Sequence, residues 1–185
     1  MKPTIIEWIT ALYERMPPEV RPLAIIGGGA LRAYFDGTQT KDIDLFFRSN
    51  ADWLAAGDVL TAEGATFDSN APCGTWIARY NGAEFNLIGF HLVANVEDAA
   101  HRFDFRCVGM AGSWGPHGEV EFYAVPGAID DAEAKRLNFL TMQRTNRVAK
   151  RLRRYVDELG YTPTEQFIAD LPRCSTVPAN TGCTY

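Results

Sequence analysis

The sequence predicts one α/β (α+β) domain: a mixed, twisted sheet of about five strands flanked by helices, followed by a helical C-terminal third. Two observations predict this fold. Apolar strands alternate with glycine turns and helices up to residue 64, and strand-forming segments separated by turn residues fill most of residues 65–125. The 185 residues, 46% of them apolar, are enough for one well-buried domain and too few for two.

Helices and apolar strands alternate in the first part of the chain. The N-terminal segment has apolar residues at helical spacing and ends at Pro17-Pro18. Ser49 and Asn50 are favourable capping residues, and Gly64 is a typical helix stop. The expected elements are a helix over residues 3–16, a strand over 23–27, a helix over 30–35, a strand over 42–47 and a helix over 50–63.

Strands and then helices are expected beyond residue 64. Asn81-Gly82, between two strand-forming runs, is a strong hairpin signal. We expect strands over 75–80, 84–90, 103–110 and 119–125, a short helix from residue 95, and helices over 129–142, 146–159 and 164–171. The chain would then be a single domain over 1–172, with a sheet-containing core over 1–125 and a helical part over 126–172, and a C-terminal tail over 173–185.

The net charge of −5 argues against general coating of nucleic acid, but it hides a basic segment. Residues 135–154 include eight basic residues and no acidic one, so a partner of this segment would be anionic. The four cysteines form no closely spaced pair, which is typical of reduced thiols, although a Cys174–Cys183 bridge stays open. No apolar run reaches the roughly 18 residues of a membrane span, so we expect a cytoplasmic protein with no membrane partner.

The stretch AIIGGGALRAYFDGTQTKDIDLFF (residues 24–47) places two aspartates shortly after a glycine cluster. It lacks the Gly-Lys-Ser/Thr of a P-loop, and Arg32 stands where the dinucleotide-binding fingerprint needs a third glycine. Side chains alternate along a strand, so Asp42 and Asp44 share a face. A divalent cation such as Mg²⁺ or Mn²⁺, bound together with substrate phosphates, would relieve their repulsion. A solvated pair at a strand edge is the alternative.

Ile26-Gly-Gly-Gly-Ala-Leu-Arg32 together with Asp42-Ile-Asp44 resembles the signature of the nucleotidyltransferase superfamily, which shares the DNA polymerase β-like fold. The chain looks most like its small single-domain bacterial and phage members. The resemblance implies a minimal nucleotidyltransferase domain. It also implies Mg²⁺- or Mn²⁺-dependent transfer of a nucleoside monophosphate from a nucleoside triphosphate (NTP) to a hydroxyl acceptor, with release of pyrophosphate.

The resemblance also assigns roles to single residues. Gly27 and Gly28 would contact the triphosphate, with Gly29 the alternative partner if the glycine pair is shifted by one position. Asp42 and Asp44 would bind the metals and carry catalysis. The acceptor stays unspecified and could be an RNA end, a protein side chain or a small molecule.

The family usually has a third carboxylate on a later strand. Glu84 is the only acid in the strand expected over 84–90, which makes it the candidate third metal ligand and catalytic residue that orients the nucleophile. Asn86 shares its face, and Asp104 competes from the next strand. This departure from an aspartate supports an alternative function: a non-catalytic binding or assembly module on the same fold, such as a phage structural or antitoxin-type protein.

Arginines are candidates for contact with the triphosphate. Arg32 would support the glycine turn or a phosphate. The helix expected over 146–159 has an apolar stripe that packs it onto the body, and its other face is basic. This face either binds phosphates or nucleic acid or is only solvated. Its arginines are Arg144, Arg147, Arg151 and Arg154.

Overall fold

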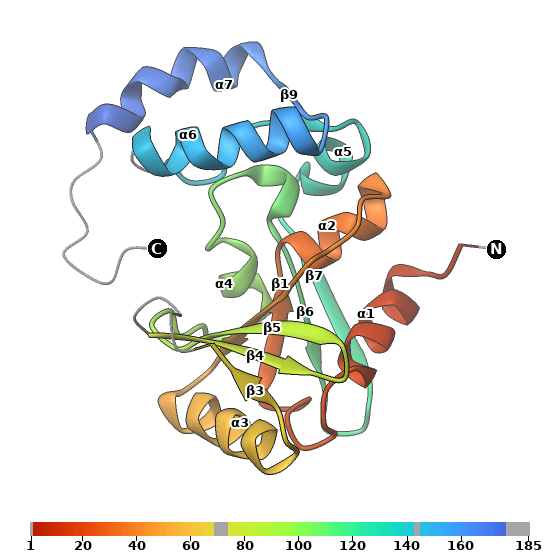
Figure 1. The fold of residues 1–185 in the computed structure, drawn as a ribbon. Helices are drawn as coiled ribbons and strands as arrows, with labels where there is room; N and C mark the ends of the chain where they lie inside the picture. The colour runs from red at the N-terminus through yellow and green to blue at the C-terminus, as the bar shows by residue number, and fades with distance from the viewer. Residues whose placement is uncertain (1, 69–73, 143–144, 177–185) are drawn as a thin grey trace.

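A computed structural model describes residues 2–68, 74–142 and 145–176 and has a central twisted sheet with helices packed around it (Figure 1). The helices are α1 (Ile5–Glu14), α2 (Gly29–Asp36), α3 (Asn50–Ala62), α4 (Val96–Ala100), α5 (Ala128–Glu133), α6 (Thr145–Arg153) and α7 (Glu165–Asp170). The strands are β1 (Ala24–Gly27), β2 (Ile43–Phe47), β3 (Thr66–Phe67), β4 (Thr75–Tyr80), β5 (Ala83–Ile88), β6 (Met110–Trp114), β7 (Val120–Ala124), β8 (Arg136–Leu137) and β9 (Thr162–Pro163). Figure 1 shows α6 and α7 beyond the end of the sheet where α2 lies, and α3 at the opposite end.

The main sheet has seven strands in the order β3-β4-β5-β2-β1-β6-β7. Every neighbouring pair is antiparallel except β2 and β5, which are parallel. The predicted α+β class, with a mixed sheet flanked by helices, is confirmed. The sheet is larger than expected partly because β3, at one edge, is only two residues long and has too short a pattern to predict.

The centre of the sheet is apolar because β1 and β2 are covered on both sides. All four residues of β1 are buried, and so are four of the five residues of β2. Tyr13 of α1 anchors this helix to the sheet, since its hydroxyl lies 2.9 Å from the carbonyl of Ala24 and 2.8 Å from that of Gly112. Rigid packing on both faces fixes the ends of β1 and β2, where the polar side chains begin.

Local sequence signals at several element ends are confirmed. The Ser49 hydroxyl caps α3 as expected, and α1 begins with a capping box of Thr4 and Glu7 that was not predicted. Asn81 and Gly82 adopt φ values of 47° and 73°, as a tight turn between β4 and β5 requires. The hairpin that sets the register of β5 is therefore encoded locally.

The strand expected over 103–110 is wrong. A 3₁₀ turn covers Arg106–Val108, and β6 begins only at Met110. Asp104 is the physical reason, because its carboxylate is buried against Arg151 and its carbonyl accepts the N–H of Leu140 at 2.8 Å. These contacts draw the backbone away from the sheet, although the local sequence favours a strand.

The helix expected over 129–142 is also wrong beyond its second turn, because α5 ends at Glu133. Lys135 takes a left-handed φ of 49°, and its Nζ donates to the carbonyl of Leu159 at 3.0 Å. The chain then pairs β8 with β9 in parallel. Tertiary pairing overrides the helical periodicity here.

The last helices follow the prediction. α6 continues through a π-helical turn over Arg154–Glu158, and α7 is followed by a 3₁₀ turn over Leu171–Thr176. Residues 177–185, with Cys183, lie outside the described residues, so the expected tail and bridge stay predictions. Among the helices in the described ranges, none is both long and apolar enough to span a membrane.

Candidate functional site

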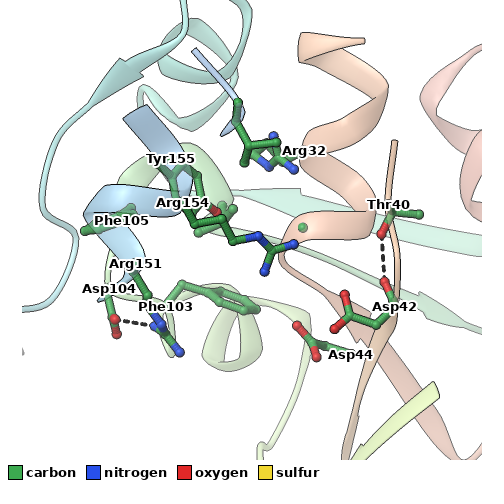
Figure 2. Close-up of a pocket in the computed structure, with 13 residues that line it drawn as sticks. Arg32, Thr40, Asp42, Asp44, Phe103, Asp104, Phe105, Arg151, Arg154 and Tyr155 are labelled. Atoms are coloured by element: carbon green, nitrogen blue, oxygen red, sulfur yellow. Dashed lines mark hydrogen bonds and ion pairs between the residues drawn. The ribbon is translucent and has the colours of Figure 1, made fainter. Parts of the chain in front are cut away.

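Three neighbouring strands bring polar side chains to one point at the end of the sheet. β2 lies between β1 and β5, so Asp44 stands opposite Gly27 on one side and opposite Asn86 on the other. Asp42 comes immediately before β2. Figure 2 shows the carboxylates of Asp42 and Asp44 side by side at one pocket. The spacing of two residues thus places both on one face, as alternation along a strand requires.

Asn86 bridges the two carboxylates. Its Nδ2 donates to Asp42 Oδ2 at 3.0 Å and to Asp44 Oδ1 at 2.9 Å. Burial and the neighbouring charge of Asp42 raise the pKa of Asp44 to about 6, whereas the hydrogen bond from Asn86 opposes this rise. A neutral amide therefore leaves much of the repulsion uncompensated. Two hard oxygen ligands that repel each other are suited to Mg²⁺ or Mn²⁺.

The structure does not bring Glu84 to this pair. Its carboxylate forms an ion pair with Arg79 across the β4–β5 hairpin, with 2.8 Å between Oε2 and Nη2. Glu84 does not line the pocket, whereas Asn86, two residues further along β5, contacts both aspartates. Glu84 was predicted as the third metal ligand because it is the only acid in its strand. The parallel register of β5 with β2 instead places Asn86 opposite Asp44.

The glycine turn has less open backbone than the sequence suggested. The Gly28 N–H donates to the carbonyl of Met110 at 3.0 Å, and Gly27 pairs with both neighbouring strands. A Cβ on Gly28 would lie 2.6 Å from the Phe103 ring and one on Gly27 would lie 3.0 Å from it. A Cβ on Gly29 would meet nothing within 4 Å. Gly29, the first residue of α2, is thus the glycine that faces open space.

Arg32 is buried, at 3% exposure, one turn into α2. Its guanidinium forms an ion pair with Asp36 and donates to Thr38 Oγ1 at 3.0 Å. The rings of Tyr155 and Tyr161 lie 5.6 and 5.8 Å from its Cζ. Arg32 lines the pocket, and its buried Nε has no hydrogen-bond partner among the described residues. The guanidinium thus holds the C-terminal end of α2 and keeps one spare donor.

The opposite wall of the pocket comes from α6 and the π-helical turn. Arg151 forms an ion pair with Asp104, and Arg147 Nε lies 3.7 Å from the same carboxylate. Arg154 is exposed and, like Arg151, lines the pocket, whereas Arg147 does not. In Figure 2, the Arg154 guanidinium extends across the pocket on the side opposite Asp44. The predicted Arg144 lies outside the described residues.

These walls enclose a cavity of about 140 Å³. Ligand pockets are usually larger, from roughly 300 Å³, so a nucleotide would fill this cavity with part of its length and leave the rest in solvent. Within residues 2–68, 74–142 and 145–176, no three acidic, histidine or cysteine side chains gather as a metal site. Phe103 and Tyr155 also line the cavity, and no local pattern in the sequence marks them, because Phe103 reaches the glycine turn and Tyr155 reaches Arg32 from distant segments.

Residues 4–132 match the model of a family described as "Gabija anti-defense 2 family protein". The match covers the glycine turn, both aspartates and Asp104, and it ends before α6. No curated protein is similar enough in sequence to match the chain.

Solved structures with a similar fold include tRNA-processing enzymes. A "tRNA-processing enzyme (apo form I)" aligns with a TM-score of 0.61 at 19% identity, over 94% of this chain and 48% of that one. A tRNA nucleotidyltransferase, complexed with a primer tRNA and an incoming ATP analog, aligns at 0.60 and 18%, over 83% and 47%. The Thermotoga maritima CCA-adding enzyme, complexed with tRNA, aligns at 0.62 and 16%, over 90% and 41%. The chain thus has a nucleotidyltransferase-like fold and spans less than half the length of these enzymes.

Proposed function

The chain belongs to the Gabija anti-defense 2 family, and we propose that it acts against that defence as a metal-dependent nucleotidyltransferase. It would transfer a nucleoside monophosphate from an NTP to a hydroxyl acceptor and release pyrophosphate. One observation carries the proposal: Asp42 and Asp44 meet at a cavity whose opposite wall is formed by arginines. Solved relatives in fold that were complexed with ATP and CTP support the choice of an NTP.

Asp42 and Asp44 would hold Mg²⁺ or Mn²⁺. Mg²⁺ is commonly bound by one or two carboxylates plus substrate phosphates, so the absence of a third acid beside the pair in the described residues is compatible with binding. The bound cation would neutralise phosphate charge and lower the pKa of the attacking hydroxyl. The raised pKa of Asp44 agrees with this assignment, because burial and the charge of Asp42 outweigh the opposing effects of Asn86, Arg151 and Arg154.

The other lining residues would bind the phosphates. Gly29, which faces open space at the start of α2, would offer its backbone N–H, and Arg32 would offer its spare Nε. Arg151 and Arg154 face them from α6 and the turn that follows. The leaving pyrophosphate gains negative charge, and these arginines would stabilise it. Asp104 would position Arg151 rather than bind the metal, since its carboxylate already pairs with that guanidinium.

The presence of Asn86 beside the two aspartates favours a second function, in which the protein binds a nucleotide without catalysis. An amide stands where a carboxylate would complete the metal site, so the protein could bind a nucleotide without turning it over. In that case it would act in anti-defence as a nucleotide-binding module, and no acceptor would be needed. In the first case the acceptor is an RNA end, a protein side chain or a small molecule.

Calorimetric titration with ATP, in Mg²⁺ and in EDTA, tests both functions. We expect binding in Mg²⁺ and little in EDTA, with loss of binding in Asp44→Asn and no loss in Asp58→Asn, whose carboxylate is exposed on α3. Incubation with α-labelled NTPs and cell extract then separates the two functions. Label transfer with pyrophosphate release supports the transferase, and binding without transfer supports the module. Binding that is absent, or equal in EDTA and in Asp44→Asn, would reject both.

A further inference from the structure

Phe103 is the aromatic side chain at the centre of the pocket, and the proposed function gives it no role. It follows α4 and precedes the buried Asp104, whose contacts with Arg151 and with the N–H of Leu140 fix the backbone. Figure 2 shows Phe103 reaching from the Asp104–Arg151 pair toward Asp44. The ring is only half-buried and lines the cavity.

The contacts of the ring leave one of its sides free. Its outer edge packs on the backbone of Gly27 and Gly28, where a Cβ would lie 3.0 and 2.6 Å from it. Phe46 packs against it in a T-shaped arrangement, with 5.7 Å between ring centroids, and is the only ring that does so in the described part of the chain. A half-exposed ring surface therefore remains as part of the cavity wall.

The other aromatic side chains of the cavity are already engaged. Phe105 is 1% exposed and belongs to the core. Tyr155 packs edge-on against Phe105 and Tyr161, at 5.0 and 5.2 Å, and its ring lies beside the guanidinium of Arg32. Phe103 is thus the lining ring that can accept a flat ligand group without giving up such contacts.

The distribution of charge decides which part of a nucleotide would lie on this ring. An apolar ring surface offers no donor to a phosphate, and Phe103 also covers the backbone of Gly27 and Gly28. The charged donor suited to a phosphate, Arg32 of α2, lies apart from Phe103 in Figure 2, with the Arg154 guanidinium between them in this view. A nucleotide with its phosphates near α2 and its reacting phosphate at Asp42 and Asp44 would place its nucleoside at Phe103.

We infer that Phe103 is the nucleoside platform of this site, on which the base or ribose of a nucleoside triphosphate packs. The inference rests on the proposed function and deepens it. Stacking on an aromatic ring discriminates weakly between bases because every base has a π-face. The arginine next to the platform, Arg154, is exposed and placed to cover the other face of a bound base. The chain would accordingly accept more than one NTP.

A comparison of two ligands separates this role from others. ATP and inorganic tripolyphosphate share the phosphates, and only ATP has a nucleoside. Their affinities in Mg²⁺ would be measured by calorimetry for the wild type, Phe103→Leu and Phe103→Tyr. Phe67→Leu is the matched control, because Phe67 is a partly exposed ring on the edge strand β3 and does not line the cavity.

Phe103→Leu should weaken ATP binding about tenfold, the scale of one lost stacking contact, and change tripolyphosphate binding less than about twofold. Phe103→Tyr should keep ATP affinity, and Phe67→Leu should change neither ligand. Tighter binding of both ligands to Phe103→Leu would show that the ring blocks the site and would overturn the inference. Equal weakening of both, or no change, would also overturn it. A wild type that binds neither ligand would reject the proposed function as well.

Discussion

The two walls of the pocket are built in different ways. The strand wall presents Asp42 and Asp44, which Asn86 of the neighbouring strand β5 holds through two hydrogen bonds. The helix wall consists of Arg151 and Arg154, long side chains of which the first is half-buried and the second exposed. Backbone pairing fixes the acids within a rigid sheet, whereas an ion pair with Asp104 orients Arg151. The strand wall is thus suited to fixing a reacting group, and the helix wall to adjusting to a ligand.

The family match follows the same division. It covers residues 4–132 and therefore the whole strand wall, whereas α6 and the helix wall lie beyond it. Asp104 lies inside the match and forms an ion pair with Arg151 outside it. Changes on each wall should accordingly affect different properties: metal and nucleotide binding on the strand wall, and the packing of α6 on the helix wall.

The largest effect is expected on the strand wall. Asp44→Asn removes one of the two proposed metal ligands, so metal-dependent ATP affinity should fall at least about a hundredfold. Replacing a residue that only supports a metal ligand costs up to about a hundredfold, and losing a ligand itself should cost no less. Calorimetry in Mg²⁺ measures it, with Asp58→Asn as the control. Retained affinity in Asp44→Asn would show that the pair is structural.

On the helix wall, Asp104→Asn should mainly lower stability. The carboxylate is 1% exposed and compensates Arg151 and Arg147, so its loss should cost about 2 kcal/mol, somewhat less than a fully buried pair because both arginines are partly exposed. Thermal unfolding would measure it. Asp170→Asn, which breaks the surface pair with Arg173, should change stability much less. An equal change in both variants would mean that Asp104 does not hold the wall.

Asn86→Asp would add a third carboxylate beside Asp42 and Asp44. Without metal, three neighbouring acids repel one another, so the melting temperature should fall below that of the wild type. With Mn²⁺, the extra ligand should increase metal affinity about tenfold and raise the melting temperature more than in the wild type. If Mn²⁺ stabilises the variant no more than the wild type, the amide does not occupy a ligand position.

The pH dependence of stability should differ between the wild type and Asp44→Asn. The folded pKa of Asp44 is raised to about 6 by burial and by Asp42, above its ordinary value of 3.8. The folded state therefore binds the proton more tightly, and acidification from about pH 6 to pH 4 stabilises it through this group. Without metal, Asp44→Asn should melt a few degrees above the wild type at pH 7.5, with a smaller difference at pH 4.5. A difference that is independent of pH would contradict the shift.

The sequence predicts the strand wall better than the helix wall for a physical reason. Spacing of two along a strand translates directly into a shared face, and Asn81-Gly82 specifies its own turn. The position of Arg151 depends instead on Asp104, 47 residues away, and the packing of Phe103 on Gly28 joins segments still further apart in the chain. Such contacts leave no periodic pattern. Glu84 was favoured by residue type, whereas the register that selects Asn86 appears only in the folded sheet.

The smallest effect is therefore expected at Glu84, which was predicted from the sequence as the third metal ligand. A residue that orients the nucleophile would lose about a hundredfold or more in turnover when its charge is removed. In the structure, Glu84 pairs with the half-exposed Arg79 and does not line the cavity, so Glu84→Gln removes only a surface ion pair. We expect less than about 1 kcal/mol of lost stability and metal-dependent ATP affinity equal to that of the wild type. Calorimetry beside Asp44→Asn checks this, and a loss comparable to that variant would place Glu84 in the site and require β5 to shift its register against β2.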